Sequence, residues 1–128
     1  MTLITTTNEL VDACSLLSIA DYLTVDTEFM RETTFWPKLC LLQIAGPNHA
    51  FAIDPLAKNI NLEPVLKLLA DKSITKVMHA ARQDMEIFYH LTGSLPQPLF
   101  DTQIAAMVCG FGDQVGYESL VSKLNGTR

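Results

Sequence analysis

Two acidic residues separated by a single position, Asp26 and Glu28, follow an apolar-rich run that ends at Val25. In an extended strand, side chains two positions apart point to the same face, so this pair would present two carboxylates together. Like charges repel unless a cation lies between them, and hard ions such as Mg²⁺ prefer carboxylate oxygens. The pair therefore indicates a divalent metal site. A solvated strand end or a helix-capping pair is the alternative, because Asp-x-Glu is short and common.

A third acidic residue, Asp84, lies where a short apolar segment gives way to a helical pattern. In α/β sheets, ligand sites gather outside the ends of strands, so Asp84 is expected near Asp26 and Glu28. The alternative is an exposed acid in the first turn of a helix, where the helix dipole favours negative charge.

The elements that must position these acids follow from apolar spacing and turn signals. Strands are expected over about 21–29, 39–45, 50–53 and 74–78, and the first three are close enough to be antiparallel neighbours. Helical patterns cover about 8–18, 62–69, 80–91, 101–108 and 117–124, with Thr6 or Thr7, Asn61 and Asp101 as N-caps. An antiparallel meander followed by alternating helices and strands predicts an α/β sheet domain.

Bulk properties set limits on the function. The 128 residues are 48% hydrophobic and 18% charged, which predicts one folded domain rather than a disordered chain. The net charge of −5 is unusual for a protein that tracks nucleic-acid phosphates. Arg31, Lys38 and Arg82 are expected to form a local basic rim that offsets this charge.

The chain shows no secretory signal and no apolar stretch long enough to span a bilayer, so a cytoplasmic protein without membrane contact is expected. Three widely spaced cysteines, Cys14, Cys40 and Cys109, are interpreted as reduced core residues rather than as a disulfide framework or a zinc site.

Four segments taken together resemble ribonuclease D, of the DEDD superfamily of 3′→5′ exonucleases. They are VDTEF at 25–29, WPKLCLLQI at 36–44, HAARQD at 79–84 and LPQPLFDTQIAA at 95–106. Each is weak alone, but their order and spacing are specific. The resemblance implies a ribonuclease H-like fold, with an antiparallel three-stranded meander and parallel strands in one mixed sheet flanked by helices.

The resemblance also implies roles for individual residues. Asp26, Glu28 and Asp84 match metal-binding acids, which would hold two divalent ions, Mg²⁺ or Mn²⁺, for hydrolysis of phosphodiester bonds at the 3′ end of single-stranded RNA, such as a tRNA precursor. Asp101 is expected to be a helix N-cap rather than a metal ligand. His79 is expected to be a scaffold residue rather than a proton carrier. Phe29 and Gln43 either line the path of the 3′-terminal nucleotide or simply pack.

One motif of the family has no match. The family carries a fourth aspartate within a Tyr-x-x-x-Asp motif on a later helix, whereas Tyr117 is followed four positions on by Val121. We therefore expect residues 1–128 to be part of one exonuclease domain, C-terminally incomplete and without the helical RNA-binding domain that follows in ribonuclease D. Impaired hydrolysis and self-association through a surface left uncovered are the expected consequences.

Two other functions stay open. The missing acid and the net charge also fit a non-catalytic fragment that binds nucleic acid or a partner protein. A small-molecule nucleotide-binding domain has little support, because no glycine-rich phosphate loop follows any expected strand.

Overall fold

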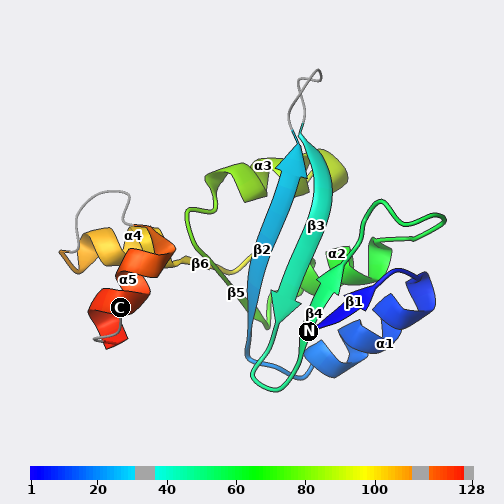
Figure 1. Ribbon diagram of the computed structural model, residues 1–128, viewed down its shortest axis with the longest axis horizontal. Helices are drawn as coiled ribbons and strands as arrows, with labels where there is room; N and C mark the ends of the chain where they lie inside the picture. The colour runs from blue at the N-terminus through cyan, green and yellow to red at the C-terminus, as the bar shows by residue number, and fades with distance from the viewer. Residues whose placement is uncertain (31–36, 111–115, 126–128) are drawn as a thin grey trace.

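The computed structural model describes residues 1–30, 37–110 and 116–125. Its centre is one six-stranded sheet of order β1-β4-β3-β2-β5-β6 (Figure 1). The strands are β1 (Thr2–Ile4), β2 (Tyr22–Met30), β3 (Lys38–Ala45), β4 (Ala50–Ile53), β5 (Thr75–Met78) and β6 (Leu99–Asp101). Pairs β2–β3 and β3–β4 are antiparallel, whereas β1–β4, β2–β5 and β5–β6 are parallel. The expected antiparallel meander within a mixed sheet is therefore confirmed.

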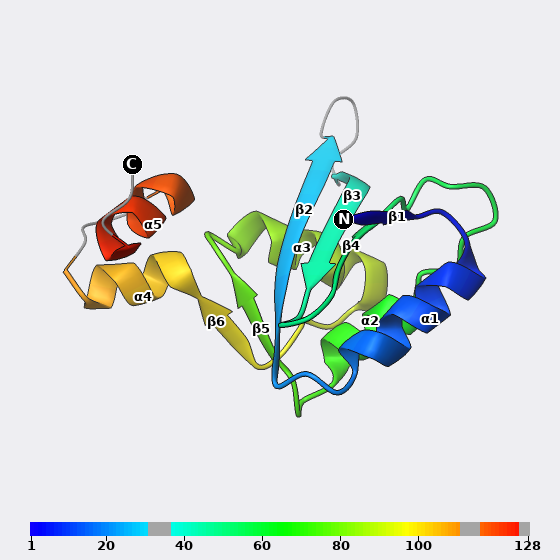
Figure 2. The ribbon, with the colours of Figure 1, turned by 60° about the horizontal axis from the view of Figure 1, so that its bottom comes forward.

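In the described part of the chain, five helices accompany the sheet: α1 (Thr7–Leu17), α2 (Glu63–Ala70), α3 (Arg82–Thr92), α4 (Thr102–Val108) and α5 (Tyr117–Asn125). In Figure 1, α2 and α3 lie behind the central strands, and one core cluster contains buried residues of α1, α2 and α3. The helices α4 and α5 lie beyond the edge formed by β6, as Figure 2 also shows. They share a small cluster of their own, made by Ala106 and Leu120.

Side-chain caps mark the starts of α1 and α4. Thr6 caps α1 through a capping box in which its hydroxyl accepts from the Glu9 N–H at 3.2 Å and the Glu9 carboxylate accepts from the Thr6 N–H at 3.2 Å. The prediction for α2 needs a correction, because Leu62 is its N-cap and has no side-chain capping bond. Asn61 lies one position earlier, and its side-chain oxygen still accepts from the Glu63 N–H at 2.9 Å.

Strand β2 separates the core from the exposed face of the sheet. Its burial alternates along its length, with Leu23, Val25 and Thr27 buried. The intervening positions Asp26 and Glu28 are exposed. Because α1, α2 and α3 share a core with the buried side chains of β2, the two carboxylates lie on the opposite face, away from that core.

A buried lysine, Lys76, joins the segments that precede β5 and β6. Its side chain is 0% exposed, and its ammonium group donates to the backbone oxygen of Asp71 and, at 3.0 Å, to that of Gln97. Burial lowers the pKa of Lys76, while the nearby negative charge of Asp71 acts in the opposite direction. Lys76 therefore ties two connections together at the end of the sheet where β5 begins.

The cysteines only partly match expectation. None forms a disulfide; Cys14 and Cys40 are half-buried, and burial raises the pKa of the Cys14 thiol to about 11. Cys109 was expected in the core but is exposed, because it directly follows α4 at the edge of the molecule. Within the described ranges, no helix is long and apolar enough to cross a membrane.

Candidate active site

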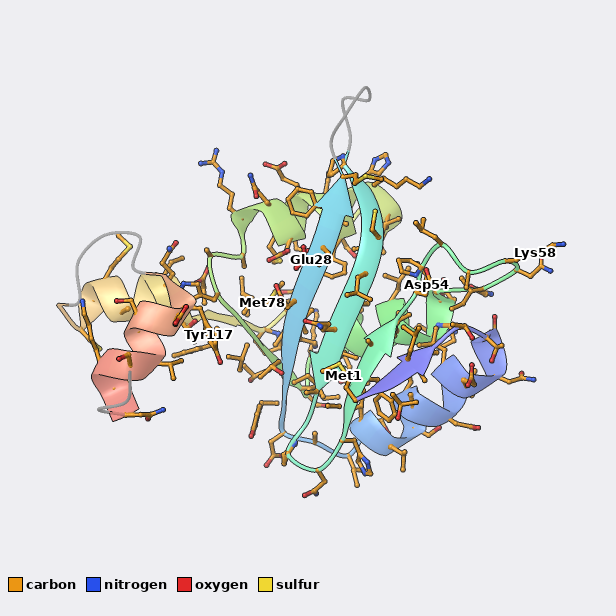
Figure 3. All side chains as sticks on the ribbon, in the orientation of Figure 1. Met1, Glu28, Asp54, Lys58, Met78 and Tyr117 are labelled. Carbon is orange, nitrogen blue, oxygen red and sulfur yellow. The ribbon has the colours of Figure 1, made fainter. Side chains whose placement is uncertain are left out.

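The exposed acids of β2 lie beside an irregularity in the sheet. Asp26 pairs with Gln43 and Glu28 with Leu41, but Phe29 pairs with Leu39, so Cys40 of β3 is passed over. A bulge of this kind locally increases strand twist and changes the direction of neighbouring side chains, and bulges are common next to active sites. Glu28 is labelled on β2 in Figure 3. Asp26 and Glu28 are both exposed and lie two positions apart on β2, so they share one face, as the spacing predicts.

Asp84 lies in the first turn of α3 and is buried, with 8% of its surface exposed. It accepts a hydrogen bond from the hydroxyl of Thr27, the residue between the two exposed acids. The alternative interpretation of Asp84 as an exposed acid in a first helical turn is therefore wrong about its exposure. The helix start is as expected, but the side chain turns toward β2.

The electrostatics of Asp84 connect it to the other acids. Burial raises the pKa of Asp84, the Thr27 hydrogen bond lowers it, and nearby negative charges raise it further, namely those of Asp26, Asp101 and Glu28. The ionised carboxylate of Asp84 is thus disfavoured both by its surroundings and by like charges. A cation placed among these groups would relieve both effects.

The three acids have the donor type that a divalent metal ion prefers, but their side chains are not grouped around one point. In the part of the chain that the structure describes, no three His, Cys, Asp or Glu side chains are grouped so that they could hold a metal ion. Asp84 is turned toward Thr27 on the buried side of β2, while Asp26 and Glu28 lie on the exposed side. The donors are nonetheless all carboxylates, which suit a hard divalent cation.

Asp101 is a structural carboxylate at the junction of β6 and α4. It accepts from the backbone N–H groups of Ala80 at 3.0 Å, Ala81 at 2.8 Å and Gln103 at 2.9 Å. Burial acts to raise the pKa of Asp101, but these bonds outweigh it and hold the pKa below its ordinary value. Ala80 has a φ of 52°, which is unfavourable for a residue with a Cβ. Asp101 caps α4, as predicted, and also fixes the connection that leads into α3.

His79, at the end of β5, is held by Thr102. The Thr102 hydroxyl donates to the Met78 carbonyl at 3.2 Å and lies 2.8 Å from the His79 Nδ1. Because a hydroxyl has one proton to donate, Nδ1 must be the donor in this second bond. The ring also contacts Tyr117 edge to face, with ring centroids 5.7 Å apart and planes at 73°. These contacts support a positioning role for His79.

A hollow of about 380 Å³ lies beside Asp26. Its walls include Asp26 and Gln43 from the central strands, His79 from the end of β5, and Tyr117 from the start of α5. Figure 3 labels Met78 and Tyr117, which also line it. The structure thus brings together Asp26, Gln43 and His79.

The comparisons with known proteins decide the family. A family model described as 3′-5′ exonuclease matches residues 1–128. The chain belongs to the 3′-5′ exonuclease family.

Within this exonuclease family, the relatives support the resemblance seen in the motifs. The chain is 56% identical over 125 residues to a ribonuclease D of Granulibacter bethesdensis and 52% identical over 126 residues to one of Bartonella henselae. Each match covers 98% of this chain, but 32% and 31% of the relative, respectively. The chain therefore spans about a third of the length of the curated relatives that it matches.

A solved structure confirms the fold. Escherichia coli RNase D, described as an exoribonuclease involved in structured RNA processing, is similar with a TM-score of 0.91 and 40% identity. The match covers 98% of this chain and 33% of that chain. The predicted resemblance to ribonuclease D and the predicted fold are both confirmed by these matches.

Other residues singled out from the sequence are placed differently in this exonuclease domain. Glu28, Asp84 and Phe29 do not line the hollow. Phe29 is half-buried and, by alternation, shares the side of β2 that carries Thr27. In the expected basic rim, Lys38 and Arg82 are exposed, and Arg31 lies outside the described residues.

Sequence reasoning missed Thr27, Thr102 and Tyr117. Thr27 had a usable signal, because a hydroxyl between two acids in a strand must face the opposite, buried side and needs a partner there. Thr102 and Tyr117 reach His79 only through the folding of the chain, and nothing local marks either contact.

Proposed function

We propose that this chain carries the metal-binding face of a ribonuclease D-like 3′→5′ exoribonuclease. One observation supports this proposal most directly: Asp26 and Glu28 are exposed on one face of β2, and both raise the pKa of the buried Asp84. Three acids that repel one another are unfavourable in a protein unless a cation compensates them. In a 3′-5′ exonuclease, the cations that compensate these charges would also serve the hydrolysis.

In this proposal, Asp26, Glu28 and Asp84 hold two divalent ions, Mg²⁺ or Mn²⁺. Such ions, when bound, activate a water molecule and stabilise the leaving oxygen. The remaining tasks belong to the chain. Thr27 orients Asp84 through its hydroxyl, and Asp101 fixes the connection from which α3 starts.

The proposed substrate is the 3′ end of a single-stranded RNA, such as a tRNA precursor. Gln43 and His79 share the hollow with Asp26, so we propose that they contact the 3′-terminal nucleotide. For Phe29 the same contact remains a prediction. The relatives are named ribonuclease D, and the E. coli protein is described as acting in structured RNA processing. With a net charge of −5, binding would depend on the bound ions and on exposed groups such as Lys38 and Arg82.

The proposal includes an impaired rate. After Asp84, the sequence has no tyrosine followed four positions later by aspartate. We propose that residues 1–128 form part of one exonuclease domain; assayed alone, they contain no such fourth acid, so one of the two ions should bind to them more weakly. We therefore expect hydrolysis slower by orders of magnitude than in a chain that contains this acid.

Self-association and a cytoplasmic location complete the proposal. Large apolar side chains are exposed on α4 and α5, with Val108 at 84% and Leu124 at 62%. Such side chains favour association, and light scattering that shows a monodisperse monomer at high concentration would contradict this part.

Three cysteines without a disulfide support a reducing compartment.

The experiment that tests the activity follows the shortening of a 5′-labelled single-stranded RNA in Mg²⁺ or Mn²⁺. We would compare the wild-type chain with Asp26→Asn and, as a matched control, with Asp12→Asn, an exposed acid on α1. Stepwise loss from the 3′ end should fall about a hundredfold or more in Asp26→Asn, because even indirect partners of metal sites cost ~10–100-fold. The Asp12→Asn control should match the wild type. A 3′-blocked RNA should resist degradation.

A second function has one observation in its favour. No metal-holding group of three side chains is formed among the described residues, which also fits a domain that binds RNA without cleaving it. Equal degradation rates for wild type and Asp26→Asn, together with retained RNA binding, would replace the enzyme by this alternative.

A further inference from the structure

The hollow beside Asp26 has an aromatic wall that no metal-binding acid explains. Tyr117, the first residue of α5, lines it together with Asp26, Gln43 and His79. Figure 3 shows Tyr117 between α5 and β5, the strand that ends with Met78. A tyrosine from a distant helix thus reaches the candidate site at the end of the sheet strands.

The ring of Tyr117 makes one aromatic contact and is otherwise largely exposed. It contacts the His79 ring edge to face, with centroids 5.7 Å apart. His79 is itself anchored, because its Nδ1 bonds to Thr102, which bonds to the carbonyl of Met78. Yet 62% of the Tyr117 surface is exposed. An aromatic ring with one neighbouring ring and most of its surface exposed is suited to receive a flat partner.

The composition of the hollow indicates what that partner is. Its other lining residues are mostly apolar, among them Ile44, Val77 and Met78, and neither lysine nor arginine lines it among the described residues. Met1, which carries the N-terminal amine, also lines the hollow, but no described lysine or arginine side chain is there to pair with a phosphate. Aromatic stacking on a base is the sequence-tolerant contact that proteins use for single strands, and every base offers a π face.

We propose that Tyr117 is a positioning residue that stacks on a base near the 3′ end of the bound strand and thereby places the adjoining backbone beside Asp26. This inference rests on the proposed function and adds to it a base-binding residue from α5. The aromatic ring provides the contact, so the hydroxyl is not needed. The stacked base can be of any type, because nothing in the hollow requires one base edge.

The test measures affinity rather than cleavage, by fluorescence anisotropy of a short 5′-labelled RNA with non-hydrolysable linkages at its 3′ end, in the presence of Mn²⁺. The variants are Tyr117→Phe and Tyr117→Leu, with Tyr89→Leu as the control for loss of an exposed tyrosine, since Tyr89 is 55% exposed on α3. Urea unfolding of each variant shows whether it is folded. A second set of RNAs lacks the base at one of the last positions in turn.

We expect Tyr117→Leu to weaken binding about tenfold, while Tyr117→Phe and Tyr89→Leu stay within about twofold of the wild type. With the base removed at one particular position, wild type and Tyr117→Leu should bind equally. The inference is overturned if Tyr117→Leu binds like the wild type. It is also overturned if Tyr117→Leu binds every base-free RNA more weakly than the wild type does, and by the same factor. A loss of affinity in Tyr117→Phe as large as that in Tyr117→Leu would overturn it as well.

The same measurements separate this inference from the proposed function. If the wild type binds and degrades RNA but Tyr117→Leu is unchanged, the proposed function stands and the stacking role is rejected. If the folded wild type binds no RNA in Mn²⁺, both are rejected together.

Discussion

Thr27 donates its hydroxyl to the carboxylate of Asp84, and so joins the centre of β2 to the first turn of α3. The two residues on either side of Thr27 are the exposed acids Asp26 and Glu28. One tripeptide therefore presents two carboxylates to solvent and, from its other face, holds the third. This hydrogen bond therefore links the position of Asp84 to that of β2.

Replacement of Thr27 by valine should destabilise the fold at neutral pH by about 1–3 kcal/mol, because the buried Asp84 carboxylate loses its hydrogen-bond donor. Urea denaturation measures the free energy of unfolding. Thr27→Ser is the matched control, since it keeps the hydroxyl and loses only a methyl group. A valine variant as stable as the wild type would show that this bond contributes nothing.

Replacement of Asp84 by asparagine should make the metal-free chain more stable at neutral pH. Burial and three neighbouring acids raise the pKa of Asp84, so its ionised form is disfavoured in the folded state. For a carboxyl group with a raised pKa, the stabilising contribution is fully present below the unfolded value of about 3.9 and is lost as the pH rises through the folded value. In the presence of a chelator, the free energy of unfolding of the wild type should therefore fall as the pH rises through this range, and that of Asp84→Asn should fall less. Parallel pH profiles for the two proteins would contradict the assignment.

Divalent ions should stabilise the wild-type chain in thermal unfolding, because a ligand that binds only the folded state adds about 2.7 kcal/mol at a hundred times its dissociation constant. Mg²⁺ or Mn²⁺ should raise the midpoint, and a chelator should reverse the effect. Asp26→Asn should abolish most of the response, whereas Asp12→Asn should keep it. An equal response in all three proteins would mean that the ions bind elsewhere.

Replacement of Asp101 by alanine should cost about 0.5–2 kcal/mol from the lost cap of α4, and more from the released N–H groups of Ala80 and Ala81. The pKa of Asp101 lies below its ordinary value, so its contribution is present above the unfolded value of about 3.9 and is lost as the pH falls through the folded value. Acid unfolding of the wild type and the variant should therefore converge at low pH. A constant difference between them would contradict this role.

The parts of the site that depend on local rules were predictable from the sequence. The alternation of a strand places Asp26 and Glu28 on one face, and the capping preference of aspartate places Asp101 at the start of α4. The burial of Asp84 was not predictable, because it depends on how closely α3 approaches β2. Strand β6 is only Leu99–Asp101 and forms through its parallel pairing with β5, so its sequence carries almost no signal. The meeting of Tyr117 with His79 depends on the path of the chain around that edge.

The buried amine of Lys76 can report when the structure opens, because it reacts with a reagent only when it becomes exposed. The other five lysines, Lys38, Lys58, Lys67, Lys72 and Lys123, are exposed, whereas Lys76 is sealed between two backbone carbonyls. An acylating reagent should therefore modify the exposed amines at once and reach Lys76 only when the sheet opens. Mass spectrometry of this single site, followed over time, would report how often the part of the sheet around β5 opens.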